Sequence, residues 1–309
     1  ETLIKSYPNE ALLYNISGIC YKTIGKLNEA VKSFEKALAI KPDYAEVHYN
    51  LGVTLQELGQ LDAAIKSYKQ ALTIKPDYAI AYNNLGITLK KLGQLDAAIK
   101  SYEQALTIKP DYADAHNNLG NTLRDLNQLD AAVKSFEQAL AINPDYAQVY
   151  QNYGGAMKRL KRPDEALVSF ERALALKPDI NFLLGDLLHT KMHLCLWDDL
   201  PNDLNELTKK INNNEKVIVP FPLLAMIDDP EIQRKTAEIF ANEKYPKNHD
   251  LPEIGQYPKH KKIRIGYFSA DFKEHPVSAL TAELYEVHDR AQFEIHAFSY
   301  GPDTKDKMN

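Results

Sequence analysis

Apolar residues follow a helical period as far as Pro178, and the whole pattern returns with a 34-residue period. One unit shows the two apolar faces: Tyr82, Leu85, Gly86 and Leu89 in its first segment, and Ala98, Tyr102 and Ala105 in its second. Each unit therefore predicts two antiparallel helices, and Gly86 and Ala98 provide small side chains where the helices approach closely. Residues 9–178 contain five such units, and residues 1–8 align with the end of a preceding second helix. Stacked units of this kind predict a right-handed α-solenoid.

Proline, aspartate and glycine mark the turns of each unit. Prolines recur at the same 34-residue spacing, and from the second proline onward each is followed by an aspartate: Asp43, Asp77, Asp111, Asp145 and Asp179. A proline ends one helix, and the aspartate is placed to cap the next, with Glu46 and Gln148 completing capping boxes. Gly25, Gly59 and Gly93, and Asn127 in the following unit, are expected to end the first helices in the left-handed conformation.

The 34-residue rhythm stops after Pro178. Residues 179–258 predict a helical cap and connector, with one helix near 181–200 and two more at 203–213 and 230–244. From residue 261 the period becomes strand-like: KIRIGYFSA and FEIHAFSYG predict strands, and SALTAELYEVHD between them predicts a helix. A strand, a helix and a strand form one βαβ unit, so residues 259–309 predict the beginning of an α/β domain with a parallel sheet. The fold class is therefore mainly α, with an α/β segment at the end.

Composition narrows the classes of partner. Basic residues number 37 and acidic residues 42, giving a net charge of −5, which argues against a nucleic-acid partner. No apolar run reaches the roughly 18 residues of a membrane-spanning helix. Two cysteines, Cys20 and Cys195, in a chain of this size fit a reducing compartment rather than a disulfide scaffold. We therefore expect a cytoplasmic protein without contacts to nucleic acid or membrane.

The loop after the first predicted strand carries the best candidate chemistry. Asp271 and His275 lie between the carboxyl end of this strand and a predicted helix that starts near Ser278. Open α/β sheets place ligands at such a position, and a histidine can serve there as acid or base. The alternative is that His275 only satisfies loop carbonyls.

A row of asparagines occupies one position of the first helices: Asn50, Asn84, Asn118 and Asn152. At about 100° per residue, Asn84 points roughly 150° away from the core face, so we expect it to face solvent. Asparagine is a poor helix former, and side-chain amides can both donate to and accept from an extended peptide backbone. The alternative is a polar surface inherited by repeat duplication.

Two resemblances sharpen these predictions. The repeat pattern resembles the tetratricopeptide repeat. The segment GYFSADFKEHPVSAL, with the later FEIHAFSY and the earlier LCLWDDL, resembles the O-GlcNAc transferase and Spindly family. This resemblance implies a glycosyltransferase of the GT-B fold with Rossmann-like domains, and an asparagine row that holds substrate protein along a concave groove.

The same resemblance implies roles for the loop. His275 matches a histidine near the sugar and the acceptor hydroxyl, sometimes assigned as a base, and Asp271 and Ser278 match other residues of that loop. The chain departs from the family at Leu280, where animal members often carry a second histidine. The implied donor is a nucleotide-sugar, UDP-GlcNAc or, as in Spindly-type relatives, GDP-fucose.

We therefore expect the substrate-binding part of a protein O-glycosyltransferase that modifies Ser or Thr; the alternative is a non-catalytic scaffold for other proteins. The 309-residue polypeptide alone is expected to be inactive, because no GxGxxG or P-loop motif occurs before residue 259. His189 and His193 are one helical turn apart without an HExxH glutamate, so no metal site is expected. Oligomeric state is not predicted.

Overall fold

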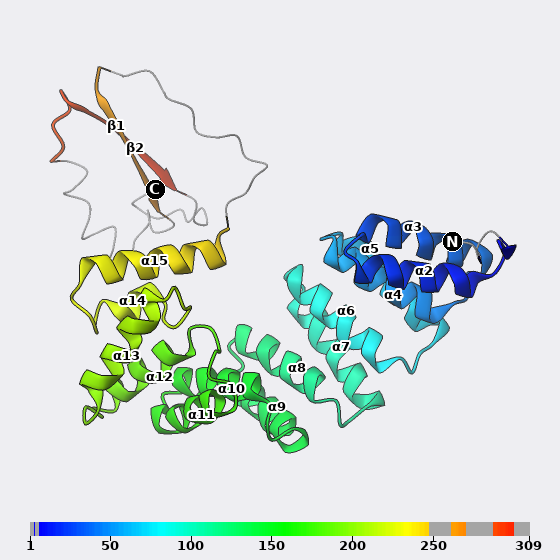
Figure 1. The fold of residues 1–309 in the computed structure, drawn as a ribbon, viewed down its shortest axis with the longest axis horizontal. Helices are drawn as coiled ribbons and strands as arrows, with labels where there is room; N and C mark the ends of the chain where they lie inside the picture. Colours follow the sequence, from blue (N-terminus) through cyan, green and yellow to red (C-terminus); the bar gives the residue numbers. More distant parts are fainter. Residues whose placement is uncertain (1–2, 4–5, 247–260, 270–286, 300–309) are drawn as a thin grey trace. The chain divides into compact units, whose positions relative to one another are not determined.

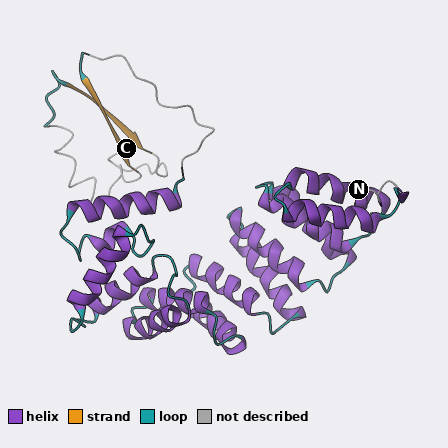
Figure 2. Ribbon diagram, in the orientation of Figure 1, coloured by secondary structure: helices purple, strands orange, loops and turns teal. Residues whose placement is uncertain are grey.

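The computed structural model describes residues 3, 6–246, 261–269 and 287–299. Contacts within the chain divide it into two units, Glu1–Pro246 and Lys247–Asn309. The first unit is helical and the described part of the second contains two strands (Figure 2). The repeat helices are α2 (Ala11–Thr23), α3 (Leu27–Ile40), α4 (Ala45–Glu57), α5 (Leu61–Ile74), α6 (Ala79–Lys91), α7 (Leu95–Ile108), α8 (Ala113–Asp125), α9 (Leu129–Ile142), α10 (Ala147–Arg159) and α11 (Pro163–Leu176).

These helices form the five predicted pairs, stacked one after another as a tetratricopeptide-type solenoid (Figure 1). Each first helix packs against its own second helix and against the second helix of the preceding pair. The first helices α2, α4, α6, α8 and α10 also contact one another in order, more than the second helices do. Since successive helices approach most closely on the inside of a curved stack, the first helices line the concave side of the repeats.

A glycine and an aromatic ring hold each pair together. A Cβ atom added at Gly86 would lie 2.6 Å from the ring of Tyr102, so only glycine lets the two helices approach this closely. Tyr102 is fully buried, and so is Ala98. The other pairs repeat the contact: Gly18 with Phe34, Gly52 with Tyr68, Gly120 with Phe136, and Gly154 with Phe170. The predicted close approach at the glycine position is confirmed.

The helix ends match the sequence in one respect and differ in another. Gly25, Gly59, Gly93 and Asn127 adopt positive φ values of 76°, 76°, 75° and 60° after the first helices, as predicted. The predicted aspartate caps are wrong. A tyrosine occupies the N-cap position of α4, α6, α8 and α10, and its side chain makes no capping bond. Each of these helices begins at the alanine two residues after the aspartate, so the carboxylate lies one position too early to cap the helix. The capping boxes predicted with Glu46 and Gln148 do not form, for the same reason.

The connector consists of α12 (Leu183–His193), α13 (Leu200–Asn212), α14 (Pro220–Leu223) and α15 (Pro230–Lys244). The helix expected across 181–200 ends at His193, because Cys195 turns the chain with φ 57°. A segment after α13 caps the start of α12: the Phe182 N–H donates to the Lys216 carbonyl at 2.5 Å, and the Gly185 N–H donates to the Val217 carbonyl at 2.8 Å. The connector has its own apolar core, made of Leu188, Leu207, Ile211, Val217, Ile218, Leu223 and Ile232.

The second unit contains a parallel pair of strands, β1 (Ile263–Ser269) and β2 (Phe293–Ser299), with Ile263 opposite Phe293. The predicted parallel pairing is therefore confirmed. The helix predicted between the strands lies outside the described residues. Among the helices that the structure describes, none has the length and apolar character needed to cross a bilayer.

Candidate functional site

The predicted loop residues Asp271, His275 and Ser278 lie outside the described residues, so their roles remain predictions. The structure does place strand β1 immediately before them, ending at Ser269 and paired in parallel with β2. The loop thus follows the carboxyl end of a strand in a parallel sheet, which is where such sheets bind ligands.

The asparagine row (Asn50, Asn84, Asn118 and Asn152) lies on the first helices α4, α6, α8 and α10. Each side chain donates one hydrogen bond to the residue 35 positions earlier, on the first helix of the preceding repeat. The bonds run from Asn50 Nδ2 to Asn15 Oδ1 (3.1 Å), Asn84 Nδ2 to Tyr49 Oη (3.1 Å), Asn118 Nδ2 to Asn83 Oδ1 (3.0 Å) and Asn152 Nδ2 to Asn117 Oδ1 (2.9 Å). The row therefore links neighbouring repeats.

This linkage corrects the expected exposure of the row. Asn84 and Asn118 are half-buried rather than fully solvent-facing, and Asn83, which accepts from Asn118, is only 4% exposed. The angular estimate considered the core between a helix and its own partner. The first helix of the preceding repeat covers the flank that carries the row, and this contact is not visible from the helical period of one unit.

The row retains hydrogen-bonding capacity toward a ligand. An asparagine amide has two N–H donors and an oxygen with two lone pairs, and the bond to the preceding repeat uses one donor. The remaining donor and the oxygen can bind an N–H and a carbonyl of an extended chain. The inter-repeat bonds fix the orientation of the amides, which lowers the entropy lost when a ligand binds.

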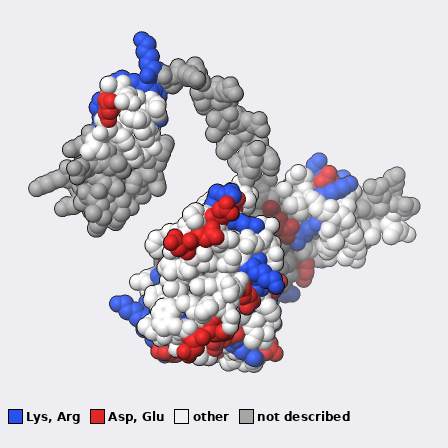
Figure 3. Space-filling view, turned by 60° about the vertical axis from the view of Figure 1, so that its left-hand side comes forward, with Lys and Arg blue, Asp and Glu red and all other residues white. Residues whose placement is uncertain are grey.

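Charged side chains of both signs are mixed on one face of the described residues. On the face shown in Figure 3, basic and acidic groups of the described residues are interspersed. Several first-helix cations pair with acids of a neighbouring helix: Lys22 with Glu57 at 3.0 Å, Lys90 with Asp125 at 2.8 Å, and Lys158 with Asp186 at 2.9 Å. On this face, the described residues therefore form no basic stripe of the kind that binds phosphate backbones.

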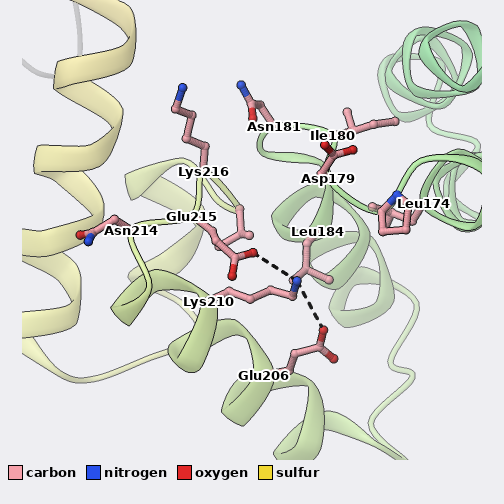
Figure 4. Close-up of a pocket in the computed structure, with 12 residues that line it drawn as sticks. Leu174, Asp179, Ile180, Asn181, Leu184, Glu206, Lys210, Asn214, Glu215 and Lys216 are labelled. Atoms are coloured by element: carbon pink, nitrogen blue, oxygen red, sulfur yellow. Dashed lines mark hydrogen bonds and ion pairs between the residues drawn. The ribbon is translucent and has the colours of Figure 1, made fainter.

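A pocket of about 410 Å³ lies where the last repeat meets the connector (Figure 4). Its walls come from the α11–α12 turn, α13 and the segment 214–217. Asn181 lies in the turn, and Glu215 and Lys216 lie in the segment. Lys210 lies between Glu215 and Glu206, at 3.3 and 3.9 Å, and Lys216 pairs with Glu243 at 2.6 Å. Because carboxylates neutralise these cations, the pocket has no free charge to attract an anion. Segments far apart in the sequence form the pocket, so no local pattern predicted it.

His189 and His193 contact each other edge to face, with ring centroids 4.3 Å apart. The Nδ1 atom of His193 lies 3.0 Å from the carbonyl oxygen of His189. Burial and the nearby Lys158 and His193 lower the pKa of His189. In the described part of the chain, no group of three His, Cys, Asp or Glu side chains is arranged to hold a metal ion.

Comparison with known families divides the chain in two. Residues 43–111, 77–144 and 111–179 match the tetratricopeptide repeat, and residues 21–59 match a further TPR repeat model. Residues 172–309 match glycosyl transferase family 41. The family 41 match begins before α12, so it includes the helical connector as well as β1 and β2.

A curated relative supports the same assignment. The chain is 30% identical over 131 residues to a probable UDP-N-acetylglucosamine--peptide N-acetylglucosaminyltransferase, SEC, of Arabidopsis thaliana. The match covers 37% of this chain and spans only 13% of the length of that relative.

Solved structures resemble the repeats. MamA is 28% identical, with a TM-score of 0.50, over 55% of this chain and 92% of its own. YrrB, described as a TPR protein with an unusual peptide-binding site, is 22% identical, with a TM-score of 0.52. The match covers 62% of this chain and 96% of the YrrB chain. PilF of Pseudomonas aeruginosa is 20% identical, with a TM-score of 0.59 over 74% and 97%. The last two show the fold alone. The chain therefore contains tetratricopeptide repeats, its residues 172–309 match glycosyl transferase family 41, and it resembles the O-GlcNAc transferases.

Proposed function

We propose that this chain is the substrate-binding part of a protein O-glycosyltransferase that moves a sugar from a nucleotide-sugar to Ser or Thr hydroxyls. The observation that carries the proposal is the presence, in one chain, of repeats over residues 21–179 and a family 41 match over residues 172–309. The relative SEC is named as a transferase of N-acetylglucosamine from its UDP donor, which favours UDP-GlcNAc over GDP-fucose here.

In this proposal the asparagine row binds the acceptor protein as an extended segment on the concave side of the repeats. The support is the position of the row on the first helices, the retained donors and acceptors of its amides, and their fixed orientation. Repeats of this class generally bind peptides or proteins, and the row offers backbone-directed hydrogen bonds that do not depend on the acceptor's sequence.

His275 takes the proton of the acceptor hydroxyl in this proposal, with Asp271 and Ser278 as further residues of the same loop. Transfer forms a bond between the hydroxyl oxygen and the sugar carbon, breaks the bond from that carbon to the diphosphate, and releases the hydroxyl proton. Removal of a general base costs about 10²–10⁴-fold in turnover.

The test is transfer of labelled N-acetylglucosamine from UDP-GlcNAc to a Ser/Thr peptide by the natural protein that contains this chain, with GDP-fucose as the parallel donor. His275→Ala should lower kcat by about 10²–10⁴-fold and leave the peptide Kd near the wild-type value. His189→Ala, in the helical unit, is the matched control. Wild-type turnover in His275→Ala would remove this residue from the mechanism, and transfer from GDP-fucose alone would reassign the donor.

A non-catalytic scaffold is the second candidate, favoured by the likeness of the repeats to YrrB. A scaffold would bind peptides through the asparagine row with the same affinity in the presence and absence of donor, and would transfer neither sugar.

A further inference from the structure

The first helices carry a second row of polar residues, six positions after the asparagine row: Lys22, Gln56, Lys90, Arg124 and Lys158. Where this position holds a lysine, a carboxylate on the next helix along the stack neutralises it. Lys22 pairs with Glu57 and Lys90 with Asp125, each 35 positions later, at 3.0 and 2.8 Å. Lys158, in the last repeat, pairs with Asp186 of α12 at 2.9 Å.

Arg124 breaks this rule, because the residue 35 positions later is Arg159. Arg159 donates from Nη1 to the Arg124 carbonyl at 2.7 Å and from Nη2 to Asn127 Oδ1 at 3.0 Å, so neutral oxygens hold it. Within the described residues, the carboxylate nearest to Arg124 is that of Asp125, 3.9 Å from Nε, and Lys90 already binds it at 2.8 Å. Arg124 therefore shares the Asp125 carboxylate with Lys90, while neutral oxygens hold the neighbouring Arg159.

The incomplete compensation of Arg124 matters because this residue is partly desolvated. Its side chain is only 26% exposed, and burial lowers its pKa; the attraction of Asp125 opposes this decrease and the repulsion of Arg159 adds to it. An arginine stays charged in proteins under such conditions. A partly buried positive charge next to a second one is unfavourable until an anion arrives, and charge-assisted hydrogen bonds to guanidinium are among the strongest in proteins.

Gly155 leaves room beside the Arg124 guanidinium. It occupies a position that holds Val53 and Ile87 in earlier repeats. A Cβ added at Gly155 would meet only Arg124 Nη1 within 4 Å, at 3.8 Å, so an atom of a ligand can be placed there.

We propose that Arg124, Arg159 and Gly155 form a subsite for one acidic residue, Asp or Glu, of an extended peptide on the repeats. The carboxylate binds the two guanidinium groups over Gly155. The subsite gives the groove a side-chain preference, which the backbone-directed asparagine row does not provide. The inference rests on the proposed peptide binding by the repeats.

Isothermal titration of the 309-residue chain with acetylated and amidated peptides tests the subsite. One Glu is moved along a Ser/Thr/Val-rich peptide, and each peptide is matched with one that carries Gln at the same place. At the best position the Glu peptide should bind about tenfold more tightly than the Gln peptide, as expected for one charge-assisted hydrogen bond. The preference should decrease as salt increases.

Three variants assign the preference to the subsite. Arg124→Gln should make the Glu and Gln peptides equivalent. Arg159→Glu should do the same by restoring the cation–acid pairing seen at Lys90 and Asp125, and it should not destabilise the fold. Arg172→Gln removes an exposed charge on the second helix α11, paired with Asp145 at 3.1 Å, and should keep the full preference.

The outcomes separate the two proposals. Equal affinity for Glu and Gln peptides in the wild-type chain, or a preference that survives in both Arg124→Gln and Arg159→Glu, overturns the subsite and leaves peptide binding by the repeats intact. If no peptide binds at any position, peptide binding by the repeats is refuted and the subsite with it.

Discussion

The repeats and the connector bury their helices by different means, although both belong to the first unit. In the repeats, each close helix contact joins a glycine to an aromatic residue 16 positions later, as in Gly86 and Tyr102, and the same contact returns in every pair. In the connector, α12 is fixed by a segment that follows α13 in the sequence: Gly185 packs on Ile218, and the Lys216 and Val217 carbonyls cap its first turn.

This difference has an energetic consequence. An aromatic side chain covering a glycine can adjust when the glycine gains a methyl group, whereas a backbone segment held by hydrogen bonds cannot. The repeats are therefore expected to tolerate small changes at their glycines better than the connector does, even though the two contacts look equally tight.

Gly185→Ala should show the largest effect. Its Cβ would lie 2.6 Å from Ile218 Cβ and 2.8 Å from the backbone Cα of the same residue, so the capping segment itself must move. We expect the free energy of unfolding to fall by about 3 kcal/mol, the upper part of the usual range for overpacking. Urea unfolding followed by circular dichroism measures it. A loss no larger than that of Gly154→Ala would contradict the contrast between the two regions.

Gly154→Ala and Gly155→Ala test the repeat side with two adjacent glycines on α10. At Gly154 a Cβ would lie 2.5–3.0 Å from the buried ring of Phe170, and we expect a loss of about 1–2 kcal/mol. At Gly155 the space is open, and alanine should raise stability by about 0.5–1 kcal/mol through its better helix propensity. Changes of the same sign in both variants would show that the ring contact does not determine the cost.

The asparagine row provides a smaller effect that depends on the burial of the acceptor. Asn118→Ala leaves the oxygen of Asn83, which is 4% exposed, without its donor, and should cost about 1 kcal/mol. Asn84→Ala removes a donor to the half-buried Tyr49 hydroxyl, which can reorient, and a long bond of 3.4 Å from Asn83 Nδ2, and should cost about 0.5 kcal/mol. Thermal unfolding of the two variants measures the difference, and equal costs would argue against burial as its origin.

The sequence predicted the part of the fold that repeats. The 34-residue period, the glycine contacts and the left-handed ends at Gly25, Gly59, Gly93 and Asn127 follow from residue type at a fixed spacing. Lys161 has the same positive φ, 59°, at the equivalent place, and a lysine gives no signal for that conformation. The aspartate caps failed because cap prediction depends on the first helical residue, and a shift of one position moves the carboxylate out of reach.

For the asparagine row, the sequence predicted the helices that carry it but not its hydrogen bonds. The 34-residue period revealed the asparagine row. Its hydrogen bonds to the preceding repeat could not be predicted, because the accepting residue varies between asparagine and tyrosine. The mismatch of Arg124 and Arg159 becomes visible only when positions 35 apart are compared, which is the spacing of contacts between neighbouring first helices. The pocket between α11, α12 and α13 depends on non-repeating contacts and had no local signal.

The smallest expected effect is a pH dependence that belongs to the connector. Burial, followed by the charges of Lys158 and His193, lowers the pKa of His189, while Asp186 opposes the shift. The folded state therefore binds a proton at His189 less readily than the unfolded state, whose pKa is about 6.5. Stability from this residue is complete above that pH and decreases as the pH falls toward the lowered folded value. His189→Gln should flatten the decrease in urea midpoint between about pH 7 and pH 5. An unchanged slope would show that His189 does not contribute to the acid sensitivity of the connector.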